Sequence, residues 1–149
     1  MDVNVEERCN RAVALFKEGY NCAQAVYMAY SDLFGMNEEQ AARIVSSLGG
    51  GMGRLREVCG AVSGMFMIVA QRYPIVSPTD REAKTRNYEV VQQLAARFRE
   101  KNGGIVCRDL LGLDHKQDAP VPAERTAEYY RKRPCAEYVC DAAFFAGEM

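Results

Sequence analysis

The segment from Val58 to Ala70 constrains the fold most strongly, because none of its residues is charged. A helix without a charged side has no face to present to water, so we expect it at the centre of the core. Four of the five residues from 49 to 53 are glycines, which form a backbone-permissive loop just before it. Gly60 and Gly64 stand four residues apart on one helical face, where another backbone or a bound group can approach closely.

Four cysteines fall in separate expected helices: Cys22, Cys59, Cys107 and Cys135. No two cysteines are spaced as CxxC, so local zinc ribbons, thioredoxin-like motifs and ferredoxin loops are not supported. The chain has one histidine, which excludes zinc sites of the Cys2His2 and HExxH types. Any shared chemistry of these cysteines therefore requires the fold to bring them together.

The residues around these cysteines resemble the C_GCAxxG_C_C family of redox proteins. Residues 59–64, CGAVSG, match its CGAxxG motif, and residues 21–26, NCAQAV, resemble the segment of its first cysteine. Residues 107–112, CRDLLG, and residues 134–139, PCAEYV, resemble those of its third and fourth. The resemblance covers nearly the whole chain and implies redox activity at these four cysteines.

Three hypotheses follow for these thiols. Four thiolates that meet inside a helical bundle suit an iron-sulfur cluster or, alternatively, a zinc ion, with all four cysteines as metal ligands. Thiol-disulfide exchange without metal would use Cys59 as the attacking thiolate and Cys22 as the resolving thiol. In that case Arg54, Arg56 and a helix N-terminus would lower the pKa of Cys59. The third is a non-catalytic helical interaction module that contains buried thiols.

The glycines indicate where a bound group could sit. We expect Gly51 and Gly53 to shape the pocket, and Gly60 and Gly64 to let a cofactor approach the central helix. The loop matches neither the Walker nor the dinucleotide fingerprint. A close-packing turn, or a turn where a cofactor touches the backbone, is therefore favoured over a phosphate site.

The apolar spacing predicts an all-α fold over residues 1–149, a single domain of about six or seven helices around the buried central one. Cys9 falls within the apolar stripe of the first helix and is expected to be a small buried hydrophobe. Cys140 lies five residues after Cys135, so the two thiols should diverge around their helix. A helix is expected from Pro122 to about Arg133. Another helix is expected after Thr79, and the apolar residues on its inward face are Tyr88, Val91, Leu94, Ala95 and Phe98.

The composition narrows the classes of binding partner and the cellular location that we expect for this protein. A net charge of −1 with scattered Lys and Arg argues against nucleic acid, and no apolar run is long enough for membrane insertion. No secretory signal is evident, so we expect a cytoplasmic protein whose cysteines are free, metal-binding or catalytic rather than disulfide-bonded. The redox partner is unknown, and the Ala- and Gly-rich faces make a helical homodimer a candidate assembly.

Overall fold

The structure, a computed structural model, describes residues 1–149 and is all-α, as predicted. It has nine α-helices rather than six or seven, because the glycine loop itself forms the short helix α4 and Cys107 begins the short helix α7. One isolated antiparallel bridge joins Val58 to Val106. The α-helices are α1 (Val5–Glu18), α2 (Cys22–Met28), α3 (Glu38–Ile44), α4 (Gly49–Met52), α5 (Gly60–Arg72), α6 (Arg81–Asn102), α7 (Cys107–Leu110), α8 (Ala127–Lys132) and α9 (Cys135–Gly147).

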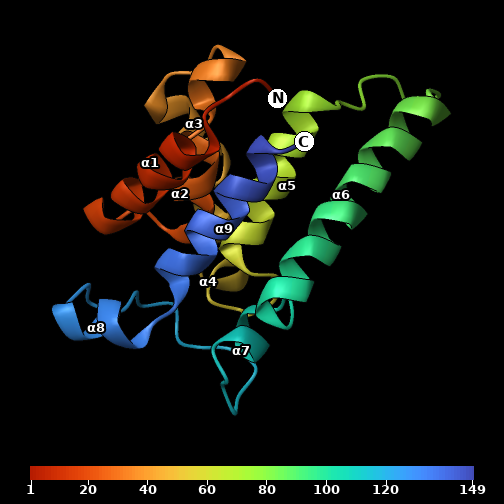
Figure 1. The fold of residues 1–149 in the computed structure, drawn as a ribbon. Helices are drawn as coiled ribbons and strands as arrows, with labels where there is room; N and C mark the ends of the chain where they lie inside the picture. The colour runs from red at the N-terminus through yellow and green to blue at the C-terminus, as the bar shows by residue number, and fades with distance from the viewer.

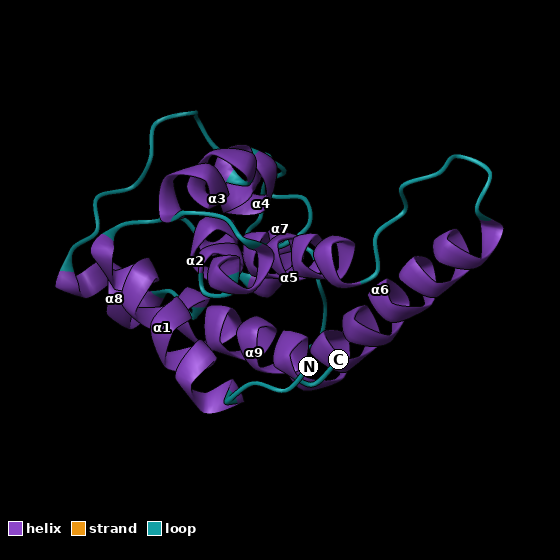
Figure 2. Ribbon diagram, turned by 90° about the horizontal axis from the view of Figure 1, so that it is seen from above, coloured by secondary structure: helices purple, strands orange, loops and turns teal.

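Helix α5 is the buried central helix that the sequence predicts. It packs against α2, α6 and α9, and Figures 1 and 2 show it enclosed by its neighbours. Gly64 explains how closely α2 approaches: a Cβ atom there would lie 2.7 Å from the backbone oxygen of Ala23. The small-residue face of α5 is therefore filled by the backbone of α2.

Helices α1 and α9 lie side by side and bring the two chain ends together (Figure 1). Asn4 caps α1 by accepting a hydrogen bond from the Glu7 amide, and Gly19 ends it in the left-handed conformation. A disulfide joins Cys9 of α1 to Cys140 of α9. Cys9 is buried, as expected, but the expectation that the cysteines are not disulfide-bonded is wrong for this pair. Cys140 diverges from Cys135, as predicted, and thereby faces α1.

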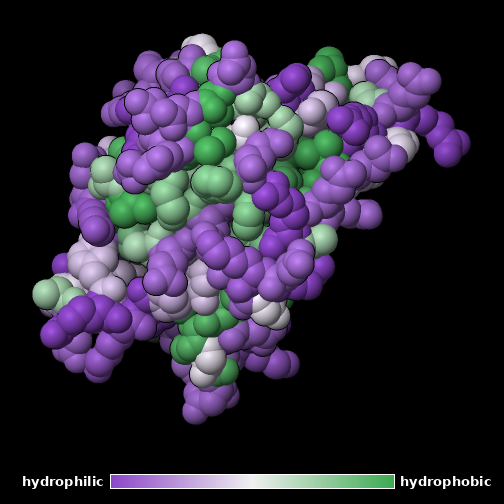
Figure 3. All heavy atoms as spheres, in the orientation of Figure 1, coloured by the Kyte–Doolittle hydropathy of each residue, from purple (hydrophilic) through white to green (hydrophobic).

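Helix α6 is long and amphipathic, and its buried face matches the predicted one in part, because Leu94, Ala95 and Phe98 are buried as predicted. Tyr88 is 55% exposed, whereas Val90 is buried in line with Leu94 and Phe98. The N-terminal half of α6 projects beyond the body, so residues there have less core to face (Figures 1 and 2). The outer side of α6 is mainly hydrophilic, while apolar surface gathers over α9 and its neighbours (Figure 3).

The segment before α8 is a loop where a helix was predicted. Helix α8 begins after Thr126, whose side chain accepts from the Tyr129 amide, and not at Pro122. Pro122 and Ala123 instead form part of a cavity wall. No helix of the structure combines the length and apolar character that a bilayer span requires.

Candidate functional site

Four cysteines stand at the beginnings of four different helices. Cys22, Cys107 and Cys135 are the first residues of α2, α7 and α9, and Cys59 precedes the first residue of α5. All four are free thiols, and all four line one cavity of about 200 Å³. Backbone N–H groups are unpaired at a helix N-terminus, and the helix dipole favours negative charge there. The fold therefore gathers the predicted cysteines at helix N-termini around one cavity.

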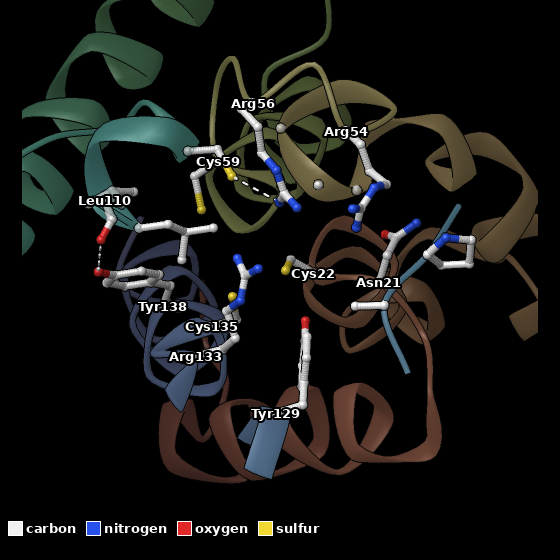
Figure 4. Close-up of a pocket in the computed structure, with 18 of the residues that line it drawn as sticks. Asn21, Cys22, Arg54, Arg56, Cys59, Leu110, Tyr129, Arg133, Cys135 and Tyr138 are labelled. Atoms are coloured by element: carbon white, nitrogen blue, oxygen red, sulfur yellow. Dashed lines mark hydrogen bonds between the residues drawn. The ribbon is translucent and has the colours of Figure 1, made fainter. Parts of the chain in front are cut away.

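The cavity wall is cationic on one part and apolar on another. Figure 4 shows Cys22, Cys59 and Cys135 turned toward the same space, with arginines and tyrosines around them. No aspartate or glutamate belongs to the wall. Its other residues are Asn21, Gly49, Gly50, Gly51, Arg54, Arg56, Gly60, Leu110, Leu111, Pro122, Ala123, Arg125, Tyr129, Arg133 and Tyr138.

The glycine loop is a close-packing turn. Gly51 has a φ of 68°, and a Cβ atom there would lie 2.6 Å from the Cβ of Cys107. Gly51 and Gly60 line the cavity, whereas Gly53 and Gly64 do not. The loop therefore brings the helix containing Cys107 against the cavity, and Gly64 serves the contact between α5 and α2.

Arg56 connects Cys107 to a polar network at the surface. Its φ of 60° is unusual for a residue with a side chain, and the side chain is buried. Its Nε donates to Asp118 at 2.7 Å, and a terminal nitrogen lies 3.6 Å from the Cys107 sulfur. Burial raises the pKa of Cys107, and Arg56 opposes that shift. Asp118 also contacts His115 at 2.8 Å, a link that the sequence did not reveal.

Cys59 does not have the lowered pKa that the sequence suggested. Burial raises its pKa to about 12 and outweighs the N–H groups of Val62 and Ala61, which favour the thiolate. Arg54 donates to the backbone oxygen of Ala119 instead, while Arg56 is engaged by Asp118 and Cys107 as described. Cys59 lines the cavity but is a poor nucleophile in this state.

Cys135 has the most acidic thiol in the cavity. A hydrogen bond with Cys22 lowers the pKa of Cys135 to about 7 against the effect of burial, with the charges of Arg133 and Arg125 adding to the shift. The same hydrogen bond, together with desolvation, raises the pKa of Cys22 well above its usual value. When this pair of thiols loses one proton, the thiolate therefore forms on Cys135.

The lowered pKa predicts the pH dependence of alkylation. Only the thiolate reacts, so alkylation of Cys135 by iodoacetamide should speed up as the pH rises and level off above about 7. Cys59 should stay largely unmodified over the same range, because its pKa is raised to about 12. Peptide mass spectrometry after timed alkylation measures both sites. A midpoint for Cys135 at about 8.5, the value of an ordinary cysteine, would contradict this environment.

The fold and the cavity define an all-helical protein with four thiols in one site. The family described as "Putative redox-active protein (C_GCAxxG_C_C)" matches residues 20–149, and the chain belongs to this family. The matched range contains all four cavity cysteines and excludes Cys9. No curated protein and no solved structure matches the chain.

Proposed function

We propose that the protein works by thiol-disulfide exchange, with Cys135 as the attacking thiolate and Cys22 as the resolving thiol. The observation that carries this proposal is that both thiols line one cavity and turn toward the same space, where the interaction between them lowers the pKa of Cys135 and raises that of Cys22. An attacking thiol works best when its pKa lies near the ambient pH, and a resolving thiol must lie within reach of it. Cys22 keeps the role that the sequence suggested, and Cys135 takes the role proposed there for Cys59.

The reaction balances as a two-electron exchange. The Cys135 thiolate attacks a substrate disulfide, R–S–S–R′, forms a mixed disulfide with R and releases R′–S⁻, which takes up a proton. Cys22 then loses its proton and attacks the Cys135 sulfur, which forms the Cys22–Cys135 disulfide and releases R–S⁻. The protein is oxidised by two electrons and the substrate is reduced by two. A dithiol redox partner returns the protein to its starting state by the reverse steps.

A cysteine-ligated iron-sulfur centre is the second candidate, supported by the four thiols around one cavity. The residues do not fit a single ion such as zinc, because no three cysteine, histidine or acidic side chains are arranged around one point. A cluster of several irons separates its cysteine ligands more widely than one ion does. Cys22, Cys59, Cys107 and Cys135 would be its ligands.

One preparation tests both candidates. Protein purified without oxygen is assayed for iron, zinc and acid-labile sulfide, then oxidised with a small disulfide and mapped by peptide mass spectrometry. We expect a Cys22–Cys135 disulfide in the wild type, and the same disulfide in the Cys59→Ser variant. Its absence from the oxidised wild type would overturn the exchange proposal.

The two alternatives give different results in this experiment. Iron and sulfide that are present in the wild type and lost in Cys59→Ser would support the cluster. Protein that holds no metal and forms no cavity disulfide would instead favour the non-catalytic interaction module. Each alternative thus predicts a result that contradicts thiol exchange, and the two results come from separate measurements.

A further inference from the structure

The cavity wall contains one arginine without a polar partner. Arg56 pairs with Asp118, Arg54 donates to a backbone oxygen, and Arg125 donates to the backbone oxygens of Phe16 and Tyr20. The side chain of Arg133 makes no hydrogen bond or ion pair, and its guanidinium lies only over the Tyr129 ring, at 5.9 Å. Its guanidinium is therefore free to bind an anionic group that enters the cavity.

Arg133 also lies next to the proposed nucleophile. It precedes Cys135 by two residues, and both residues line the cavity. Pro134, the N-cap of α9, lies between them, and no side chain caps that end of the helix. The positive end of α9 and the arginine charge thus act on the same part of the cavity. The wall contains no aspartate or glutamate that would repel an anion.

The remainder of the wall suits a small organic group. Leu110, Leu111, Tyr129 and Tyr138 offer apolar surface, and the Tyr138 hydroxyl is already engaged with the backbone oxygen of Leu110 at 3.3 Å. At about 200 Å³ the cavity lies below the usual range for drug-sized ligands, about 300–1,000 Å³. It has room for one half of a small disulfide.

We propose that the substrate is a low-molecular-weight disulfide that carries a carboxylate, with the carboxylate bound by Arg133 and the sulfur placed against Cys135. This inference rests on the proposed exchange function and specifies its substrate class. Arg133 acts in it as the residue that selects and orients the substrate. The bonds broken and formed are those of the exchange described above.

The test compares two aromatic disulfides that report exchange by absorbance, an anionic nitrobenzoate disulfide and a neutral pyridyl disulfide. Arg133→Gln should lower the ratio of the anionic to the neutral rate constant by about five- to tenfold, the loss expected for one charge-assisted contact. The ratio is used because Arg133 also favours the Cys135 thiolate, and a smaller thiolate fraction slows both reactions equally. Arg131→Gln is the matched control, since Arg131 is exposed on α8 and does not line the cavity.

Salt gives a second measurement on the unmodified protein. Raising the ionic strength should lower the anionic rate and leave the neutral rate nearly unchanged, because salt screens the attraction between the carboxylate and Arg133. An equal fall of the ratio in Arg131→Gln, or an unchanged ratio in Arg133→Gln, would overturn the substrate assignment.

A redox-inert ligand separates this inference from the function on which it rests. Calorimetry would measure binding of the S-methylated thionitrobenzoate, which keeps the carboxylate and cannot exchange. Binding that is weakened by Arg133→Gln, in a protein that shows no exchange, would support the anion site and contradict the function. Exchange without preference for the anionic disulfide and without binding of the inert ligand would contradict the anion site alone.

Discussion

Replacement of Cys22 by serine is expected to trap the mixed disulfide on Cys135. The first step needs only the Cys135 thiolate, and the serine hydroxyl still offers it a hydrogen bond. The second step needs the missing thiol. Cys135→Ser should instead lower the rate of the first step by about 100-fold or more, since burial keeps the remaining buried thiols protonated. Intact-mass spectrometry after brief treatment with a small disulfide distinguishes a stable adduct from a released product.

Cys59→Ser is the matched control for these two variants. It removes a thiol that lines the same cavity but has a pKa raised to about 12, so neither step should change much. An adduct that accumulates on Cys59 or Cys107 in the Cys22→Ser variant would contradict the assignment of Cys135 as the nucleophile. An equal loss of exchange activity in all three variants would indicate a site that needs every thiol, as a metal cluster does.

The neighbouring thiol and arginines explain why one thiol in the cavity is more acidic than the others. Cys59 and Cys135 both stand at helix N-termini, but burial outweighs the local N–H groups at Cys59. Cys135 additionally receives a hydrogen bond from Cys22 and the charges of Arg133 and Arg125. A helix N-terminus alone therefore does not decide the pKa, and the neighbouring thiol and arginines make the difference.

The sequence predicted the position of the central helix well, because only one placement suits its pattern of residues. A helix without charges can only be central, and α5 occupies that place. The side chains of Asn21 and Asn37 cap α2 and α3. The buried face of α6 was predicted only in part, because Tyr88 lies in the N-terminal half of the helix, which projects beyond the core, and is exposed.

The candidate site was predicted in part. Its cysteines could be picked out because they fall in four separate expected helices and match a family pattern. Arg125, Arg133 and Tyr129 could not, because they come from a loop and from the region of a short helix whose placement depends on tertiary contacts. The Asp118 carboxylate reaches Arg56 across 62 positions, and no local spacing signals such a contact.

The Cys9–Cys140 disulfide was missed for a similar reason. Cys9 fits the apolar stripe of α1, and its partner lies 131 residues away. Only the packing of α1 against α9 brings the two together. That packing also places the terminal amine of Met1 against the backbone oxygen of Met149. The disulfide thus joins the first and last helices of the chain.

Removal of this disulfide is expected to destabilise the protein strongly. A cross-link that closes a loop of 131 residues restricts the unfolded chain, and the chain-entropy model gives a loss of up to about 5 kcal/mol when it is removed. The Cys9→Ser/Cys140→Ser double variant should therefore unfold at much lower denaturant concentration than the oxidised wild type. Chemical denaturation followed by circular dichroism measures the difference in the free energy of unfolding.

Reductant supplies the matched control for this measurement. It should shift the wild type toward the double variant and leave the double variant almost unchanged, because the cavity thiols are already reduced. Exchange activity should persist in the folded double variant, since neither Cys9 nor Cys140 lines the cavity. Coincident unfolding curves for the oxidised wild type and the double variant would show that the cross-link contributes nothing. A double variant that folds but has lost exchange would show that the alignment of α9, and with it the position of Cys135, depends on the cross-link to α1.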